Sequence, residues 1–128
     1  MKRILLIIAL CLCSLSLQAQ NKVYCEIIES NIIGRKVKVM IDFGQRREIS
    51  SNARTLVDDQ GEVLTFNSKI DALNFLDKLG WNFLQAYTVV NGSSGSTSSQ
   101  IHWLLYKDVL EGQDPYEGLQ TKAMVDKK

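Results

Sequence analysis

The segment from Asn67 to Gly80, NSKIDALNFLDKLG, has the periodicity of a helix, and strand-like patterns lie on both sides of it. Apolar residues recur three and four positions apart between Ile70 and Leu79, which is the spacing of one helix face. Asn67 or Ser68 can cap the first turn, and Gly80 can adopt the positive φ that often ends a helix. We therefore expect a helix of about 11 residues. Its apolar face would consist of Ile70, Ala72, Leu73, Phe75, Leu76 and Leu79.

The chain before this helix has the composition of strands. Residues 22–30 are rich in β-branched and aromatic side chains, and residues 35–43 alternate between apolar and polar positions. The break between them, near residues 31–34, predicts a hairpin. Residues 44–55 are polar and aperiodic, which is typical of a loop. Residues 56–66 contain Asp-Asp-Gln-Gly between two short apolar runs, which indicates a small hairpin with a tight turn.

Two more strands are expected after the helix. The first covers residues 81–90, and the second begins at Gln100. Between them, residues 91–99 are mostly Ser and Gly, which predicts a flexible polar loop. Residues 109–128 hold the only proline and mixed charges, and we expect a loosely ordered C-terminal tail there. Strict alternation would place on one face Trp81, Phe83, Tyr87 and Val89.

The order strand, strand, hairpin, helix, strand, strand predicts an α+β fold. Its main feature would be an antiparallel sheet of four to five strands with one helix packed on one face. Residues 20–108 are enough for one such domain.

The first 19 residues have the layout of a secretory signal peptide. Lys2 and Arg3 form a basic start, residues 4–13 are continuously apolar, and Ala19 suits the position before a cleavage site. The apolar run is shorter than the roughly 20 residues that span a bilayer. An uncleaved membrane anchor is the alternative. We expect cleavage after Ala19, export to the periplasm, cell surface or medium, and no stable membrane insertion afterwards.

Cleavage would leave 109 of the 128 residues, with 13 of the 15 basic residues facing 14 acidic ones. This charge balance gives no indication of a nucleic-acid partner. Cys25 would be the single remaining cysteine, so no internal disulfide can form and the core must stabilise the fold.

The segments FNSKIDALNFLDKLGWNFLQAYTVV and IHWLLYK, at residues 66–90 and 101–107, carry a resemblance to other proteins. Together with the export signal, they resemble a family of small exported bacterial proteins of unknown function. That family has a helix, a Leu-Gly-Trp step, an aromatic strand, a loop and a closing strand. A broader group with this unit usually has an acidic residue after the tryptophan, where this chain has Asn82. The resemblance implies the fold and export, and it implies no activity, cofactor or catalytic residue.

No complete catalytic constellation is visible in the sequence. His102 is the only histidine and lies within the last expected strand. Cys25 alternates with apolar residues, which is typical of an inert core thiol, although a Cys25–His102 pair across strands is conceivable. We expect no catalytic residues.

We also expect no cofactor and no metal site. The acidic group at residues 58–62 could form a weak calcium site, but its spacing is not that of an EF-hand and a hairpin turn explains it better. Arg46 and Arg47 could bind an anion, although exposed loop charges are the simpler interpretation.

The expected helix is too small to cover the expected sheet. A helix of about 11 residues is about 16 Å long and 10 Å wide, whereas four strands span about 19 Å. The remaining apolar surface must contact other parts of the chain, another subunit or a ligand. We expect an interaction face for an unknown protein partner or a second copy. Its residues would be Tyr24, Met40, Leu84, Leu104 and Tyr106.

Two other functions remain open. The protein could bind a small molecule between the helix and the aromatic strands, or it could be a hydrolase that depends on His102.

Overall fold

The computed structural model describes Met1, residues 20–45, Ser50 and residues 52–127. The expected signal peptide and the pair Arg46–Arg47 lie outside these residues. The elements are β1 (Gln20–Ile33), β2 (Lys36–Asp42), β3 (Leu56–Val57), α2 (Lys69–Lys78), β4 (Asn82–Ser93), β5 (Ser96–Leu110), β6 (Gln120–Thr121) and α3 (Lys122–Val125).

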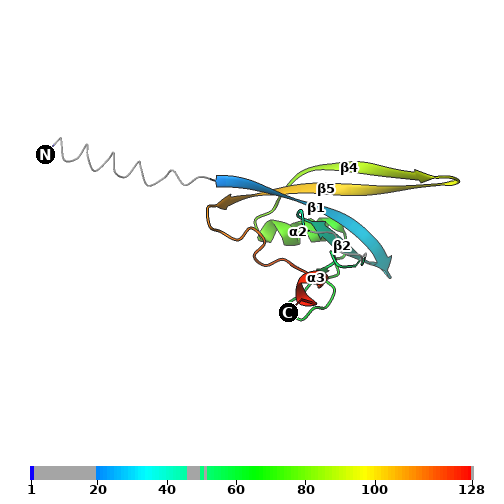
Figure 1. Cartoon of the computed structure of the whole chain (residues 1–128), viewed down its shortest axis with the longest axis horizontal. Coiled ribbons are helices and arrows are strands. Elements are labelled where there is room, and N and C mark those ends of the chain that lie inside the picture. The colour runs from blue at the N-terminus through cyan, green and yellow to red at the C-terminus, as the bar shows by residue number, and fades with distance from the viewer. Residues whose placement is uncertain (2–19, 46–49, 51, 128) are drawn as a thin grey trace.

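Four of the strands form one antiparallel sheet in the order β2-β1-β5-β4 (Figure 1). β1 and β2 form the expected hairpin, and β4 and β5 form a second, longer one. The two hairpins are joined through β1 and β5, whose register places Cys25 opposite Leu105. The fold is therefore α+β, with a mainly antiparallel sheet and one long helix, as the sequence predicts.

Helix α2 begins and ends as the sequence predicts. The Ser68 side chain accepts a hydrogen bond from the backbone N–H of Asp71, at 3.2 Å, and Asp71 lies in the first turn, where a negative charge is favourable. Gly80 follows the helix with φ of +88°, a conformation that other residues adopt at a cost. Ala72 and Leu76 are buried, but Ile70 is 57% exposed. The expected apolar face is therefore too wide at its N-terminal end.

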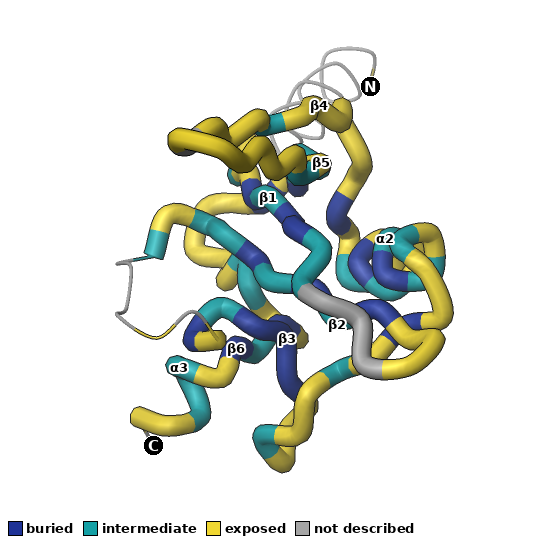
Figure 2. Tube along the Cα trace, turned by 90° about the vertical axis from the view of Figure 1, so that its right-hand side faces the viewer, coloured by how far each residue is buried: buried dark blue, intermediate teal, exposed yellow. Residues whose placement is uncertain are grey.

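The hydrophobic core lies between α2, the inner sheet face and the segment around β3 (Figure 2). We call the sheet face toward α2 the inner face and the opposite one the outer face. Val39 and Ile41 of β2, Cys25 of β1 and Leu105 of β5 are buried on the inner face. Burial of these apolar groups is the main source of stability in a chain with a single cysteine in its described part.

Trp81 is the largest fully buried side chain and joins α2 to the sheet. Its ring is stacked on Tyr116, with ring centroids 6.3 Å apart. The Nζ of the buried Lys107 lies 5.9 Å from the centroid of the Trp81 ring and donates a hydrogen bond to the carbonyl oxygen of Pro115, at 3.3 Å. These contacts bind the C-terminal segment to the core.

The C-terminal segment differs from the loosely ordered tail that the sequence suggests. β6 pairs antiparallel with β3, and Leu119 and Thr121 are buried. Backbone N–H groups of Lys122 and Ala123 donate to the carbonyl oxygens of Thr55 and Ala53, each at 3.0 Å. Scattered apolar residues hide this packing in the sequence, because their partners are distant along the chain.

The structure does not have the polar loop that the sequence predicts at residues 91–99. β4 continues to Ser93 and β5 begins at Ser96, so only Ser94 and Gly95 lie between them. The Ser-rich strand ends are held by backbone pairing, which needs no apolar side chains.

The predicted turn at Asp58 is confirmed, because its Oδ1 accepts from the N–H groups of Gln60 and Glu62, each at 2.9 Å.

Within the described part of the chain, no helix has both the length and the apolar character needed to cross a membrane.

Candidate functional site

The outer face of the sheet is accessible around Tyr24, whereas Ile28 on the same face is buried. In Figure 1, β4 and β5 lie on one side of the molecule and α2 on the other. Tyr24 of β1 lies opposite Tyr106 of β5. The next pair on the same face, two residues further along each strand, is Glu26 and Leu104. Tyr24 is 50% exposed, and Leu104 and Tyr106 are half-buried. The structure thus places three of the five expected interaction residues on one accessible surface.

The other two expected residues lie differently. Met40 is on the outer side of β2, opposite Ile28 of β1, and it forms a backbone bridge with Thr55. Met40 is half-buried beside the segment that contains Thr55, and it does not lie in the middle of the accessible surface. Leu84 lies in a bulge of β4, between residues that pair with β5, and is 49% exposed.

Because of this bulge, the side chains of β4 do not lie on the faces that strict alternation predicts. Phe83 is paired with Leu105, but Gln85 is paired with Leu104, so Leu84 is an extra residue. An extra residue shifts the two-residue period of the strand by one. Tyr87 therefore lies opposite His102 on the outer face, whereas strict alternation from Trp81 places it on the inner face.

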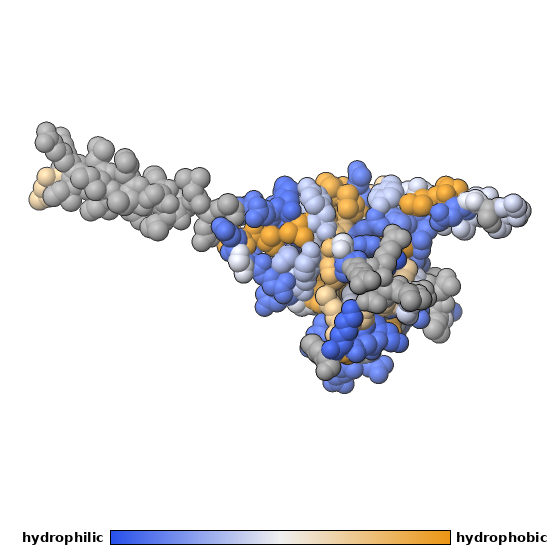
Figure 3. All heavy atoms as spheres, viewed as in Figure 1, coloured by the Kyte–Doolittle hydropathy of each residue, from blue (hydrophilic) through white to orange (hydrophobic). Residues whose placement is uncertain are grey.

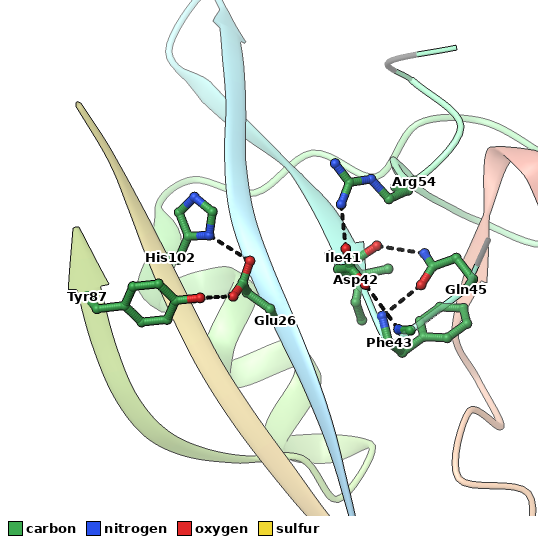
Figure 4. Close-up of polar contacts among 9 residues, drawn as sticks. Glu26, Ile41, Asp42, Phe43, Gln45, Arg54, Tyr87 and His102 are labelled. Atoms are coloured by element: carbon green, nitrogen blue, oxygen red, sulfur yellow. Dashed lines mark hydrogen bonds and ion pairs between the residues drawn. The ribbon is translucent and has the colours of Figure 1, made fainter. Parts of the chain in front are cut away.

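Three polar side chains meet on the outer face as a result (Figure 4). The Tyr87 hydroxyl donates a hydrogen bond to one carboxylate oxygen of Glu26, and Nδ1 of His102 lies 2.6 Å from the other. The rings of Tyr87 and His102 have centroids 5.3 Å apart. One residue thus comes from each of the strands β1, β4 and β5, and we call them the Glu26–His102–Tyr87 cluster.

The hydrogen bond to the Glu26 carboxylate raises the pKa of the Tyr87 hydroxyl above its ordinary value, because deprotonation would lose that bond. Tyr87 is consequently a donor at neutral pH and orients the Glu26 carboxylate. The His102 side chain is 14% exposed and the Glu26 side chain 21%. Chemically the cluster is a carboxylate with two partners, which fixes three side chains at the centre of the outer face.

The sequence indicates His102 as a candidate residue but does not indicate Glu26 and Tyr87 as its neighbours. Alternation does place Glu26 on the face of Tyr24 and Ile28, which is a signal for its side of the sheet. The bulge and the register between distant strands decide its partners, and neither is visible as a local pattern.

The conceivable Cys25–His102 pair does not form. Cys25 is opposite Leu105 on the inner face, and His102 is opposite Ile28 on the outer face, so the sheet lies between them. Burial raises the pKa of the Cys25 thiol to about 12, which keeps it protonated at neutral pH. Among the described residues, the hydrogen-bond partner of the His102 ring is a carboxylate and not a hydroxyl or thiol nucleophile.

The acidic residues of the 58–62 turn are engaged locally. Asp58 accepts the two backbone hydrogen bonds of the turn, and Asp59 accepts one from the Gln120 side chain, at 2.9 Å. Across the described ranges, no three His, Cys, Asp or Glu residues are grouped so that they could hold a metal ion.

Two hollows lie on the α2 side of the β4–β5 hairpin. The one between the helix and the aromatic strands, lined by Leu73, Trp81 and Phe83 among others, measures about 200 Å³. This is below the 300–1,000 Å³ that is usual for small-molecule sites. A wider one of about 680 Å³ is lined by Glu29, Lys69, Asn91 and residues 98–101. Its Lys69 Nζ forms an ion pair with Glu29, at 2.6 Å.

Comparison with known protein families, characterised proteins and solved structures finds no match for this chain.

Proposed function

We propose that the protein is an exported, non-catalytic protein that acts by binding another protein or a second copy of itself through the outer face of its sheet. The signal-like sequence of residues 1–19 supports export. Support for binding comes from one observation, the exposed or half-buried aromatic and aliphatic groups on the outer sheet face and at the neighbouring bulge. They are Tyr24, Leu84, Tyr87, Leu104 and Tyr106.

The chemistry of this surface suits a protein partner. Tyrosine combines a large apolar ring with a hydrogen-bonding group, which makes it common where proteins bind one another. At one end of the face Lys22 lies 4.5 Å from the centroid of the Tyr106 ring and forms an ion pair with Asp108, at 2.7 Å. Aromatic and aliphatic groups beside a charged margin are common in binding surfaces.

The test is a pair of charged substitutions with a matched control. Leu84→Lys combined with Leu104→Lys introduces charge into the outer face, and Ile70→Lys does the same at an exposed apolar position on α2. Mature proteins would serve as bait in cell-envelope extract, and circular dichroism would report the fold. We expect the double variant to stay folded and to lose the partner that wild type and Ile70→Lys retain.

Two results would contradict the proposal. Unfolding of the double variant would place Leu84 and Leu104 in the core. Unchanged capture would show that the outer face does not bind the partner.

The hollow of about 680 Å³ favours small-molecule binding as a second candidate, because its volume and its charged and amide side chains suit a polar ligand. A ligand of the native state raises the melting temperature. A panel of sugars and amino acids would be tested on wild type and on Lys69→Ala, with stabilisation of wild type alone as the supporting result.

A further inference from the structure

β4 lies at the end of the sheet order, so one of its long edges is unpaired. The other edge pairs with β5 from Asn82 to Ser93, and no described segment forms a bridge to the free one. Of residues 82–92, all are exposed except the half-buried Val89. Figure 1 shows the β4–β5 hairpin extending past the end of α2. The free edge is therefore accessible along most of its length.

The opposite edge of the same sheet is closed by the chain itself. Val37 of β2 exchanges two backbone hydrogen bonds with Phe66, each of 2.7 Å, and the N–H of Ile41 donates to the carbonyl oxygen of Arg54, at 2.9 Å. β2 also carries Lys36 and Lys38. A covered, charged edge is how natural sheets avoid unwanted pairing. The fold protects one edge and leaves the other open.

The free edge also lacks the charges that normally protect it. Residues 79–106 contain no Asp, Glu, Lys, Arg or Pro. Four of the large apolar side chains that the fold leaves exposed are on β4, and Figure 3 shows hydrophobic surface along the hairpin. They are Phe83 (50%), Leu84 (49%), Tyr87 (40%) and Val90 (62%). Such an edge favours pairing with another strand.

The hairpin turn decides which backbone groups point outward. Ser93 and Ser96 flank a two-residue turn, so they form its hydrogen-bonded pair. Bonded and non-bonded pairs alternate from there along the antiparallel ladder. The N–H and C=O groups that point away from β5 between the turn and the bulge therefore belong to Ala86, Thr88, Val90 and Gly92.

From this geometry we propose that β4 pairs antiparallel with β4 of a second copy, so that two four-stranded sheets become one eight-stranded sheet. The inference goes beyond the proposed function, because it concerns the free edge of β4 and not the outer face of the sheet. A twofold axis at Thr88 satisfies the pattern of outward groups. It places Ala86 opposite Val90 of the second copy, and Tyr87 opposite Val89 of the second copy.

This register is self-complementary. An aromatic side chain against a β-branched one is a favourable cross-strand pair, and the absence of charges leaves no repulsion across the axis. Twofold dimers with the same patch on both subunits are the commonest homo-oligomers. The two outer faces would then continue into one another across the joint.

Substitutions at Thr88 test the edge directly by sedimentation velocity of the mature protein. Thr88→Pro removes an outward N–H without removing a bond to β5, and Thr88→Lys places like charges opposite each other at the axis. Thr88→Val is the matched control that keeps the backbone and the strand propensity. We expect dimers for wild type and Thr88→Val, and folded monomers for Thr88→Pro and Thr88→Lys. If Thr88→Pro unfolds, Thr88→Lys alone decides.

Monomeric wild type, or Thr88→Lys that is dimeric to the same extent as wild type, would overturn the edge proposal. Leu104→Lys separates this failure from that of the proposed function, because Leu104 lies on the outer face and not at the edge. Wild type that is monomeric but loses its envelope partner through Leu104→Lys would refute the edge pairing and leave the outer-face function standing. A dimer that persists in Leu104→Lys supports the edge.

Discussion

Replacing Trp81 by alanine tests the joint between α2, the sheet and the C-terminal segment. Trp81 is 1% exposed, stacks on Tyr116 and lies beside the Lys107 ammonium group. Removing a fully buried aromatic side chain costs about 3–5 kcal/mol, because transfer energy is lost and a cavity remains. The free energy of unfolding of a whole domain is only about 5–15 kcal/mol. We therefore expect Trp81→Ala to lose a large part of the free energy of unfolding.

Trp81→Phe separates ring packing from the indole N–H. Nε1 of Trp81 is buried with no hydrogen-bond partner among the described residues, and such a group costs about 1–3 kcal/mol. Phenylalanine removes that penalty while it keeps an aromatic ring, so its net loss should be less than half that of alanine. Urea unfolding followed by far-UV circular dichroism measures both. A loss below about 1 kcal/mol for Trp81→Ala would refute a core position.

Three further predictions concern other parts of the fold. Tyr87 has its pKa raised by its bond to Glu26, so this bond stabilises the fold below the ordinary tyrosine pKa of about 10 and is lost as the pH rises through the native pKa. Glu26→Gln should lower the native Tyr87 pKa in an ultraviolet titration, and an unchanged titration would contradict the bond. Cys25 should resist alkylation in the native protein and react after unfolding, so rapid native labelling would contradict its burial. Leu119→Ala should cost about 2–5 kcal/mol in urea unfolding, whereas a tail free of the core would show almost no change.

Local patterns in the sequence predict the elements whose partners are near in the chain. The period of residues 67–80 and the capping Ser68 define α2, and alternation in residues 35–43 identifies the buried side of β2. These signals depend on residues a few positions apart, which the sequence displays directly.

Features that depend on distant pairing are not visible in the same way. The bulge at Leu84 reverses the face of Tyr87, and backbone pairing alone extends the hairpin through the Ser-rich residues. The contact of Leu119 with the core depends on segments far away in the chain. Of the candidate site, the sequence predicts the outer positions of Tyr24, Leu104 and Tyr106, but not the Glu26–His102–Tyr87 cluster.

Amide hydrogen exchange along β4, measured by NMR as a function of protein concentration, tests most directly whether the free edge of β4 pairs with a second copy. In the dilute monomer, N–H groups that point toward β5, such as those of Tyr87 and Val89, should be protected, and those of Thr88 and Val90 should exchange rapidly. If β4 pairs with a second copy, the N–H groups of Thr88 and Val90 become protected as the protein concentration rises, while exposed amides elsewhere do not change. Rapid exchange of Thr88 and Val90 at the highest concentration would contradict it.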